Sequence, residues 1–173
     1  MGNVLTRNII RFVLAIAVQV LFINQIDFGS ASPYLYPLFY GIFVILLPLS
    51  ISPITLILFA FFQGFIIDLF MSTGGLHASA LVMLAFARPR VLKLISPRED
   101  YDPTKPISIT FFGFQKFFLY VLILSSIQHI WFFFLEYFKF SELPSILLKS
   151  ISGALISTIL ILTTDYLTSK SNK

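Results

Sequence analysis

The sequence predicts an all-α integral membrane protein with six transmembrane helices. Of its 173 residues, 57% are hydrophobic and only 12% are charged, whereas a soluble domain has about 25% charged residues. The apolar residues gather in six runs, most of them within the roughly 17–25 residues that cross a bilayer as a helix. So few charges cannot cover a water-facing surface, which excludes a soluble enzyme and a disordered chain. Because the chain has 0 Cys, a disulfide-stapled domain and cysteine-based sites are excluded as well.

The first three runs are separated by short polar or proline-containing stretches. The first helix is expected over 9–26, about 27 Å of helix, and polar and small residues at 27–30 close it. The second run, 34–50, follows Pro33 and contains two further prolines. The third run, 53–71, begins after a very short turn.

The last three runs surround the longest polar stretch. The fourth helix is expected over 76–95, and the basic stretch 89–95 fits either the end of this span or an interfacial helix. Prolines in 96–105 prevent a continuous helix and favour a loop. The fifth and sixth helices are expected over 111–135 and 146–167. Since the spans leave no segment long enough for a soluble domain, the whole chain is expected to form one transmembrane domain.

The distribution of basic residues predicts the orientation. If the N-terminus is cytoplasmic, the cytoplasmic side receives 10 of the 12 Lys and Arg residues, and only Lys139 and Lys149 lie opposite. Basic residues concentrate on the cytoplasmic side of transmembrane helices. We therefore expect both termini and the loop 96–105 in the cytoplasm. This topology accounts for the net charge of +4 without nucleic-acid binding.

Asp68 is the clearest candidate for a functional residue, because an ionisable group deep in lipid is costly. It lies 15 residues into the third span. It fits a cation, proton or partner-helix site, or else a carboxylate that reaches the interface or bonds to backbone amides of the turn that begins at Ser72. Gly64 shares its face one helical turn earlier. A small residue beside a carboxylate favours close packing on a neighbouring helix.

Histidines and small residues supply the other candidates inside the spans. Gly74 and Gly75 form a turn, and His77 follows it as either a pH-sensitive partner of Asp68 or a hydrogen-bonded interface residue. His129 is expected to tie helices together or to join the outer aromatic belt. Two histidines in separate spans are too few to predict a metal site. Small residues in the sixth span predict a helix-packing face, formed by Ser150, Gly153, Ala154 and Ser157.

Charged residues near the inner ends of the spans are expected at the membrane surface. Arg88, Arg90 and Lys93 are expected to extend toward the headgroups. Binding of an anionic lipid, or of an acidic residue of a partner, is the alternative for these three. Asp165, near the end of the sixth span, is expected to face the headgroups too.

Motifs for catalysis are missing from the sequence. It contains no phosphate-binding P-loop, no His-Glu-x-x-His and no Gly-x-Ser-x-Gly. We therefore predict no catalytic residue, no metal and no cofactor, and the protein is not expected to be an enzyme.

Six short stretches, 8–12, 19–21, 33–36, 63–70, 74–78 and 86–89, carry a family resemblance. The most specific of them is the Gly64-x-x-x-Asp68 turn with the glycines that follow it. Together they resemble the bacterial rod shape-determining protein MreD family. Length, number of spans and terminal orientation agree as well, whereas the second half of the chain offers only hydropathy.

This resemblance implies a non-catalytic membrane scaffold in the bacterial inner membrane, within the complex that guides lateral peptidoglycan synthesis and rod shape. The implied partners are MreC, a single-span protein, and through it the MreB filament and a glycan polymerase/transpeptidase pair. The MreD family also resembles the six-helix substrate-binding subunits of energy-coupling-factor vitamin transporters. That second resemblance supplies an alternative function, a membrane-embedded subunit that binds or transports a vitamin-like small molecule.

Overall fold

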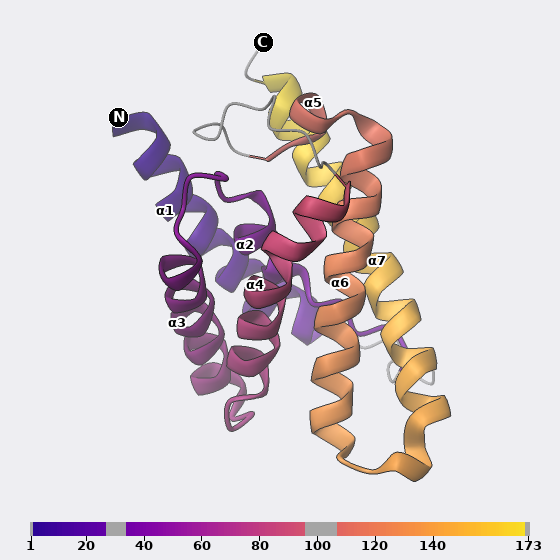
Figure 1. The fold of residues 1–173 in the computed structure, drawn as a ribbon. Coiled ribbons are helices and arrows are strands. Elements are labelled where there is room, and N and C mark those ends of the chain that lie inside the picture. Colours follow the sequence, from indigo (N-terminus) through magenta and orange to yellow (C-terminus); the bar gives the residue numbers. More distant parts are fainter. Residues whose placement is uncertain (1, 27–33, 96–106, 172–173) are drawn as a thin grey trace.

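The computed structural model describes residues 2–26, 34–95 and 107–171. It is 85% helical, and the described residues contain no strand. The α-helices are α1 (Gly2–Ala17), α2 (Ile42–Leu46), α3 (Pro53–Met71), α4 (Leu76–Ile95), α5 (Ile109–Phe112), α6 (Phe114–Tyr137) and α7 (Leu143–Ser171), as Figure 1 shows. α1 continues through a π-turn (Val18–Phe22) and a 3-10 turn (Ile23–Gln25), and 3-10 turns precede α2 (Phe39–Gly41) and α7 (Phe140–Glu142).

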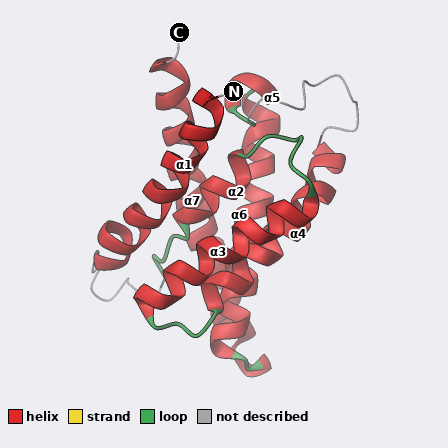
Figure 2. Ribbon diagram, turned by 90° about the vertical axis from the view of Figure 1, so that its left-hand side faces the viewer, coloured by secondary structure: helices red, strands yellow, loops and turns green. Residues whose placement is uncertain are grey.

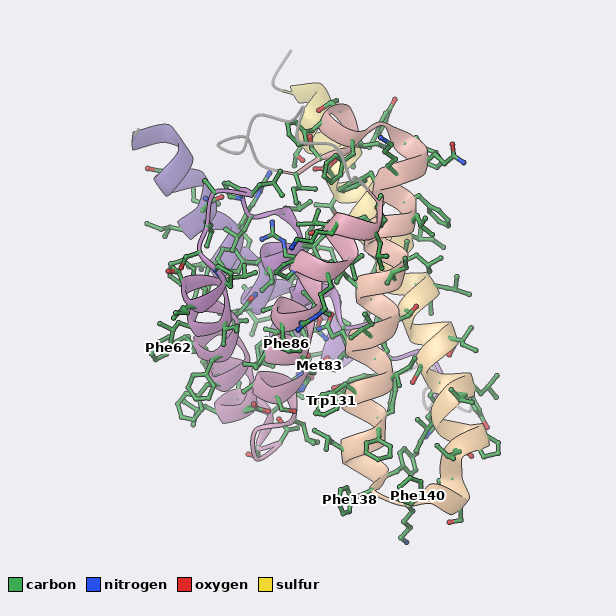
Figure 3. All side chains as sticks on the ribbon, in the orientation of Figure 1. Phe62, Met83, Phe86, Trp131, Phe138 and Phe140 are labelled. Atoms are coloured by element: carbon green, nitrogen blue, oxygen red, sulfur yellow. The ribbon has the colours of Figure 1, made fainter. Side chains whose placement is uncertain are left out.

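Four helical segments are long and apolar enough to cross a bilayer: Asn8–Gln25, Pro53–Met71, Phe114–Tyr137 and Phe140–Thr168. Their outer surfaces are also apolar. Phe62, Phe138 and Phe140 are 55%, 76% and 77% exposed, and Figure 3 shows them at the outside of the bundle. Extensive exposed apolar surface marks contact with a membrane or a partner. The prediction of an all-α, membrane-embedded protein is confirmed at this level.

The second predicted span, 34–50, is not the single helix that we expected. Only Phe39–Gly41 and Ile42–Leu46 are helical within it. Prolines explain the interruptions: Pro37 has no N–H to donate, and Pro48 holds Leu47 in an extended conformation (φ −60°, ψ 149°). Every residue from Pro37 to Pro48 is buried. The segment therefore runs through the middle of the bundle, where Figures 1 and 2 show α2.

The remaining predicted spans are helical, and some of them have shifted ends. The third and fourth have the expected bounds, and α4 continues through Pro89 to Ile95, so 89–95 is the end of that helix rather than a separate one. Gly113, at φ 77°, separates α5 from α6 and interrupts the start of the predicted fifth helix. The sixth is longer than expected, because α7 has 29 residues. The predicted loop 96–105 lies outside the described residues.

Two helical hairpins form the body of the bundle. α3 packs on α4, α6 packs on α7, and α4 also packs on α6, which joins the two hairpins. α1 lies against α2 and α3. The start of α1, the end of α4, α5 and the end of α7 lie at one end of the molecule, while the α3–α4 and α6–α7 turns lie at the other (Figure 1). We call these the basic end and the turn end.

Candidate functional site

The irregular segment Pro37–Pro48 is the centre of the candidate site. Its backbone forms only a few helical hydrogen bonds, yet it is buried in a membrane-embedded bundle. Non-helical backbone is tolerated there only when the protein itself satisfies its N–H and C=O groups. Polar side chains on the π-turn after α1 and on α3, α4 and α6 supply these partners.

Gln19, in the π-turn after α1, holds the start of the segment. Its side-chain nitrogen donates to the carbonyl oxygen of Pro37 at 3.0 Å, and its side-chain oxygen accepts from the Phe39 N–H at 2.9 Å. Gln19 is fully buried. One amide side chain thus pairs a donor and an acceptor that the interrupted helix leaves open.

His129 on α6 holds the next residue and brings α7 close. Its Nδ1 donates to the Ser125 carbonyl at 2.7 Å, so Nε2 is the acceptor, and it receives the Leu38 N–H at 3.2 Å. Ser157 of α7 lies 3.3 Å from the same nitrogen. Gly153 permits this approach, because a Cβ there would lie 2.6 Å from the imidazole Cδ2. The helix-packing face around Gly153 is buried as expected.

Arg88 is buried, 2% exposed, and does not extend toward the headgroups as predicted. Its Nη2 donates to the Leu47 carbonyl, and its Nε donates to the Tyr120 hydroxyl at 2.9 Å. Tyr120 in turn donates to the Ile45 carbonyl at 3.0 Å. Arg88 is buried because α2 ends inside the bundle, where the last carbonyl groups of that helix lack donors and favour a nearby cation. Arg90 and Lys93, by contrast, are exposed.

A fourth connection joins the segment to α3 and α4 near the turn end. Gln63 of α3 donates to the Tyr40 carbonyl at 3.0 Å. The Tyr40 hydroxyl lies 2.8 Å from Nδ1 of His77. The His77 ring therefore pairs with a tyrosine, not with the carboxylate of Asp68 that the sequence suggested as a partner.

Asp68 holds the first turn of α4. Its Oδ1 accepts the backbone N–H of His77 at 3.0 Å and the Thr73 hydroxyl at 2.5 Å, and its Oδ2 accepts the N–H of Ala78 at 2.8 Å. Among the possibilities left open by the sequence, the geometry matches a carboxylate bonded to backbone amides, although the amides belong to α4 rather than to the turn that begins at Ser72. The N-terminus of a helix favours such a carboxylate, because its first N–H groups lack partners.

Gly64 sets the distance between α3 and α4. A Cβ on Gly64 would lie 2.4 Å from the Cα of Ala78 and 2.7 Å from the backbone carbon of His77. No side chain fits at such distances, so the backbones of the two helices touch here. The same Ala78 donates its N–H to Asp68, which means that the close approach and the carboxylate bonds stabilise one another.

The turn between these helices requires left-handed backbone. Ser72 has φ 55°, and Gly74 and Gly75 have φ 62° and 98°. Glycine adopts such angles without steric cost. The space beside both glycines is open, so their role is to reverse the chain and bring Asp68 over the start of α4.

Asp165 also departs from its prediction. It is 1% exposed, and its Oδ2 accepts the N–H of Ile109 at 2.7 Å. The carboxylate therefore faces the start of α5 instead of the headgroups. The reason resembles that for Asp68. A helix, here the short α5, begins beside the carboxylate, and the first N–H groups of a helix need acceptors.

Sequence reasoning missed three of these residues, namely Gln19, Gln63 and Tyr120. The available signal was the pair of prolines in 34–50, because a span that cannot be a regular helix needs polar partners from its neighbours. A glutamine in the middle of an otherwise apolar helix is the kind of residue that supplies them.

The polar side chains of the candidate site contact backbone groups of the protein. Asp68, His129 and Arg88 use their polar atoms on main-chain groups, and no group of three metal-ligating side chains occurs among the described residues. Comparisons of the chain with protein-family models, with curated proteins and with solved structures gave no match. The geometry and the sequence resemblance are therefore the grounds on which a function can be proposed.

Proposed function

We propose that the protein is a non-catalytic membrane scaffold of the bacterial cell-elongation complex, and that it binds MreC. One observation carries this proposal: the charged side chains of the buried residues Asp68 and Arg88 form hydrogen bonds to backbone groups of the protein. Groups held in this way fix the shape of a surface and are not free to transfer protons or bind substrate. MreB and the glycan polymerase/transpeptidase pair are then reached through MreC, without a role for nucleic acid.

We also propose six crossings of the inner membrane, with both termini cytoplasmic and a fold like that of the substrate-binding subunits of energy-coupling-factor transporters. α4, with 20 residues, and the irregular segment 34–50 would add two crossings to the four long apolar helices. Two observations support this topology: α1 begins and α7 ends at the basic end (Figure 1), and α4, which also ends there, carries the basic residue Lys93 in its last turn.

Thiol labelling tests this topology, since the chain has no native cysteine. Single cysteines are introduced at Ser30, Asp102, Ser141 and Ser171 and treated with an impermeant reagent on intact cells. Labelling is expected at Ser30 and Ser141 only. Labelling at Asp102 or Ser171, but not at Ser30 or Ser141, would show the opposite orientation and would contradict a cytoplasmic basic end.

Copurification with MreC from native membranes tests the scaffold. Asp68→Leu is expected to insert normally but to retain less MreC and to give rounder cells, because the start of α4 loses its acceptor. Leu69→Ala is the matched control, since Leu69 is the neighbouring residue and 65% exposed. MreC recovery that is equal for wild type and Asp68→Leu, at equal membrane levels, would contradict the proposal.

A subunit that binds or transports a vitamin-like molecule remains the second candidate, because a groove of about 570 Å³ lies between α1 and α7. Small-molecule sites have volumes of about 300–1,000 Å³. Purified protein of this class would carry a water-soluble ligand, identifiable by mass spectrometry of the denatured sample. The scaffold would instead copurify with a single-span protein.

A further inference from the structure

A pocket between the start of α3 and the last turns of α4 collects two basic residues. Its volume is about 330 Å³, at the lower end of the 300–1,000 Å³ of small-molecule sites. The apolar part of its lining includes Pro53, Ile57 and Phe86, and the charged part consists of Arg90 and Lys93. No acidic residue of the described chain is among the lining residues. The pocket therefore joins apolar walls to two positive charges.

The two basic residues share one face of α4 with Phe86. Residues 86, 90 and 93 follow the spacing of four and three that aligns side chains along a helix. Arg88 lies on another face, is buried and donates to the Leu47 carbonyl. Arg90 and Lys93 are exposed instead. The structure thus separates three cations that the sequence treated alike, and only the outer two are directed to the pocket.

Arg90 is held back along the helix and does not reach past its end. Its guanidinium carbon lies 4.1 Å from the centre of the Phe86 ring, and its Nη1 donates to the Phe86 carbonyl at 3.1 Å. Phe86 precedes the last residue of α4, Ile95, by about 14 Å of helix. A cation held at this level of a membrane helix, against an aromatic ring, is costly without an anion beside it.

The other charge and the opposite wall differ in character. Lys93 forms no hydrogen bond or ion pair among the described residues. At the start of α3, Pro53 has no N–H, and the N–H of Thr55 already bonds to the Ser52 hydroxyl at 3.2 Å. α3 therefore contributes an apolar wall, with Ile57 at its centre, and the groups that can hold an anion come from α4.

We propose that this pocket binds the headgroup of an anionic membrane phospholipid, with the lipid phosphate between Arg90 and Lys93. The N–H groups of Arg90 that Phe86 does not use are donors for phosphate oxygens, which arginine binds in pairs. The first carbons of an acyl chain lie along Ile57 and the exposed Ile54, which precedes it on the same helix.

A net negative headgroup fits this pocket better than a zwitterionic one. The phosphate of phosphatidylcholine has a cation of its own nearby, whereas phosphatidylglycerol leaves its charge to the protein. Both surfaces of a membrane carry lipid phosphates, so the site does not depend on which end of the bundle is cytoplasmic. Neither does it require MreC, so the lipid site and the scaffold function can fail separately.

Native mass spectrometry of the full chain, released from detergent micelles, tests the proposal. The probes are phosphatidylglycerol and phosphatidylcholine with identical acyl chains, and wild type is expected to retain one phospholipid with a preference for phosphatidylglycerol. Arg90→Gln combined with Lys93→Gln should lower this preference roughly 30-fold, the effect of two basic residues at a membrane surface. Lys116→Gln, which removes an exposed cation outside the pocket, should keep it.

Ile57→Trp separates a built pocket from general attraction by positive charge. It keeps both cations but fills the pocket from α3, so the retained lipid should be lost. Leu58→Trp is its control, because Leu58 is the next residue, is exposed and does not line the pocket. Wild-type retention of phosphatidylglycerol by Ile57→Trp, or an equal loss of preference in Lys116→Gln, would overturn the proposal.

Two further measurements distinguish the lipid from other sources of negative charge. Inorganic phosphate, added in place of lipid, should leave no bound adduct, because it lacks the chains that contact the apolar wall. Displacement of the retained lipid by inorganic phosphate would overturn the assignment to a phospholipid. MreC recovery should be equal for wild type and the double variant. Loss of a copurifying protein from the double variant, with lipid retention unchanged, would instead assign the two cations to a protein partner.

Discussion

The α3–α4 hairpin and α1 are joined to the rest of the bundle in different ways. In α3, 33% of the spanning residues are buried, and its backbone touches that of α4 at Gly64. In the first span, Asn8–Gln25, only 17% are buried. There the polar connection to the buried segment is Gln19, and the groove opens along one side.

Hydropathy does not account for this difference. Both are apolar spans, with mean hydropathy 2.2 for Pro53–Met71 and 1.6 for Asn8–Gln25. In a bilayer, apolar surface alone does not drive helices together; small residues and interhelical hydrogen bonds do. Gly64 and Asp68 supply both to the α3–α4 hairpin. The first span therefore keeps a larger share of its residues exposed than α3 does.

The largest effect is expected from Gly64→Ala, which disrupts the contact between the backbones of α3 and α4. Because the added Cβ would lie 2.4 Å from the Ala78 Cα, α3 and α4 must separate, and overpacking of this kind costs about 3 kcal/mol of unfolding free energy. Denaturation in mixed micelles measures it, with Leu69→Ala as control. A loss below that of the control would mean that the helices are not in contact at Gly64.

The next largest loss of unfolding free energy is expected from Arg88→Lys. A lysine cannot reproduce the fork that contacts both Tyr120 and the Leu47 carbonyl. We expect a loss of about 1.5–3 kcal/mol, the usual range for hydrogen bonds to charged groups. The exposed Arg90→Lys serves as the matched control in the same denaturation assay. Equal stability of the two variants would place Arg88 at the membrane surface after all.

Asp68→Asn tests how much the carboxylate at the start of α4 contributes to the stability of the α3–α4 hairpin. The amide keeps one acceptor oxygen but turns an NH₂ group toward a backbone donor, either Ala78 or His77. The variant should lose about 1 kcal/mol, less than Asp68→Leu, which removes every bond. Thr73→Val, which deletes only the hydroxyl contact, should be milder still. Asn as damaging as Leu, with MreC binding intact, would favour a proton or ligand site.

The smallest effect is expected from Gln19→Leu in the loosely attached first span. Interhelical hydrogen bonds in membrane proteins contribute on average about 0.6 kcal/mol each, so the global stability should fall only slightly. Hydrogen exchange of the Phe39 amide should nevertheless rise, because that N–H loses its acceptor. Gln25→Leu, an exposed residue of the same span, should leave this amide protected.

The sequence alone determined the class of the protein and the position of most helices. Long apolar runs with few charges are stable in lipid, and this reasoning located the four helices that are long and apolar enough to cross a membrane, together with α4. It also identified Asp68 and Gly64 as one face, because residues four apart on a helix are neighbours. Local periodicity and the cost of a buried charge were sufficient for these conclusions.

Only the tertiary structure decided what the polar residues contact. The segment 34–50 was expected to be a transmembrane helix, and nothing local in its sequence showed that an irregular backbone would lie inside the bundle. Arg88 and Asp165 were assigned to the surface because charges near span ends usually reach water. Each is buried instead, since a short helix, α2 or α5, ends or begins beside it. Such partners come from distant parts of the chain, and no local pattern specifies them.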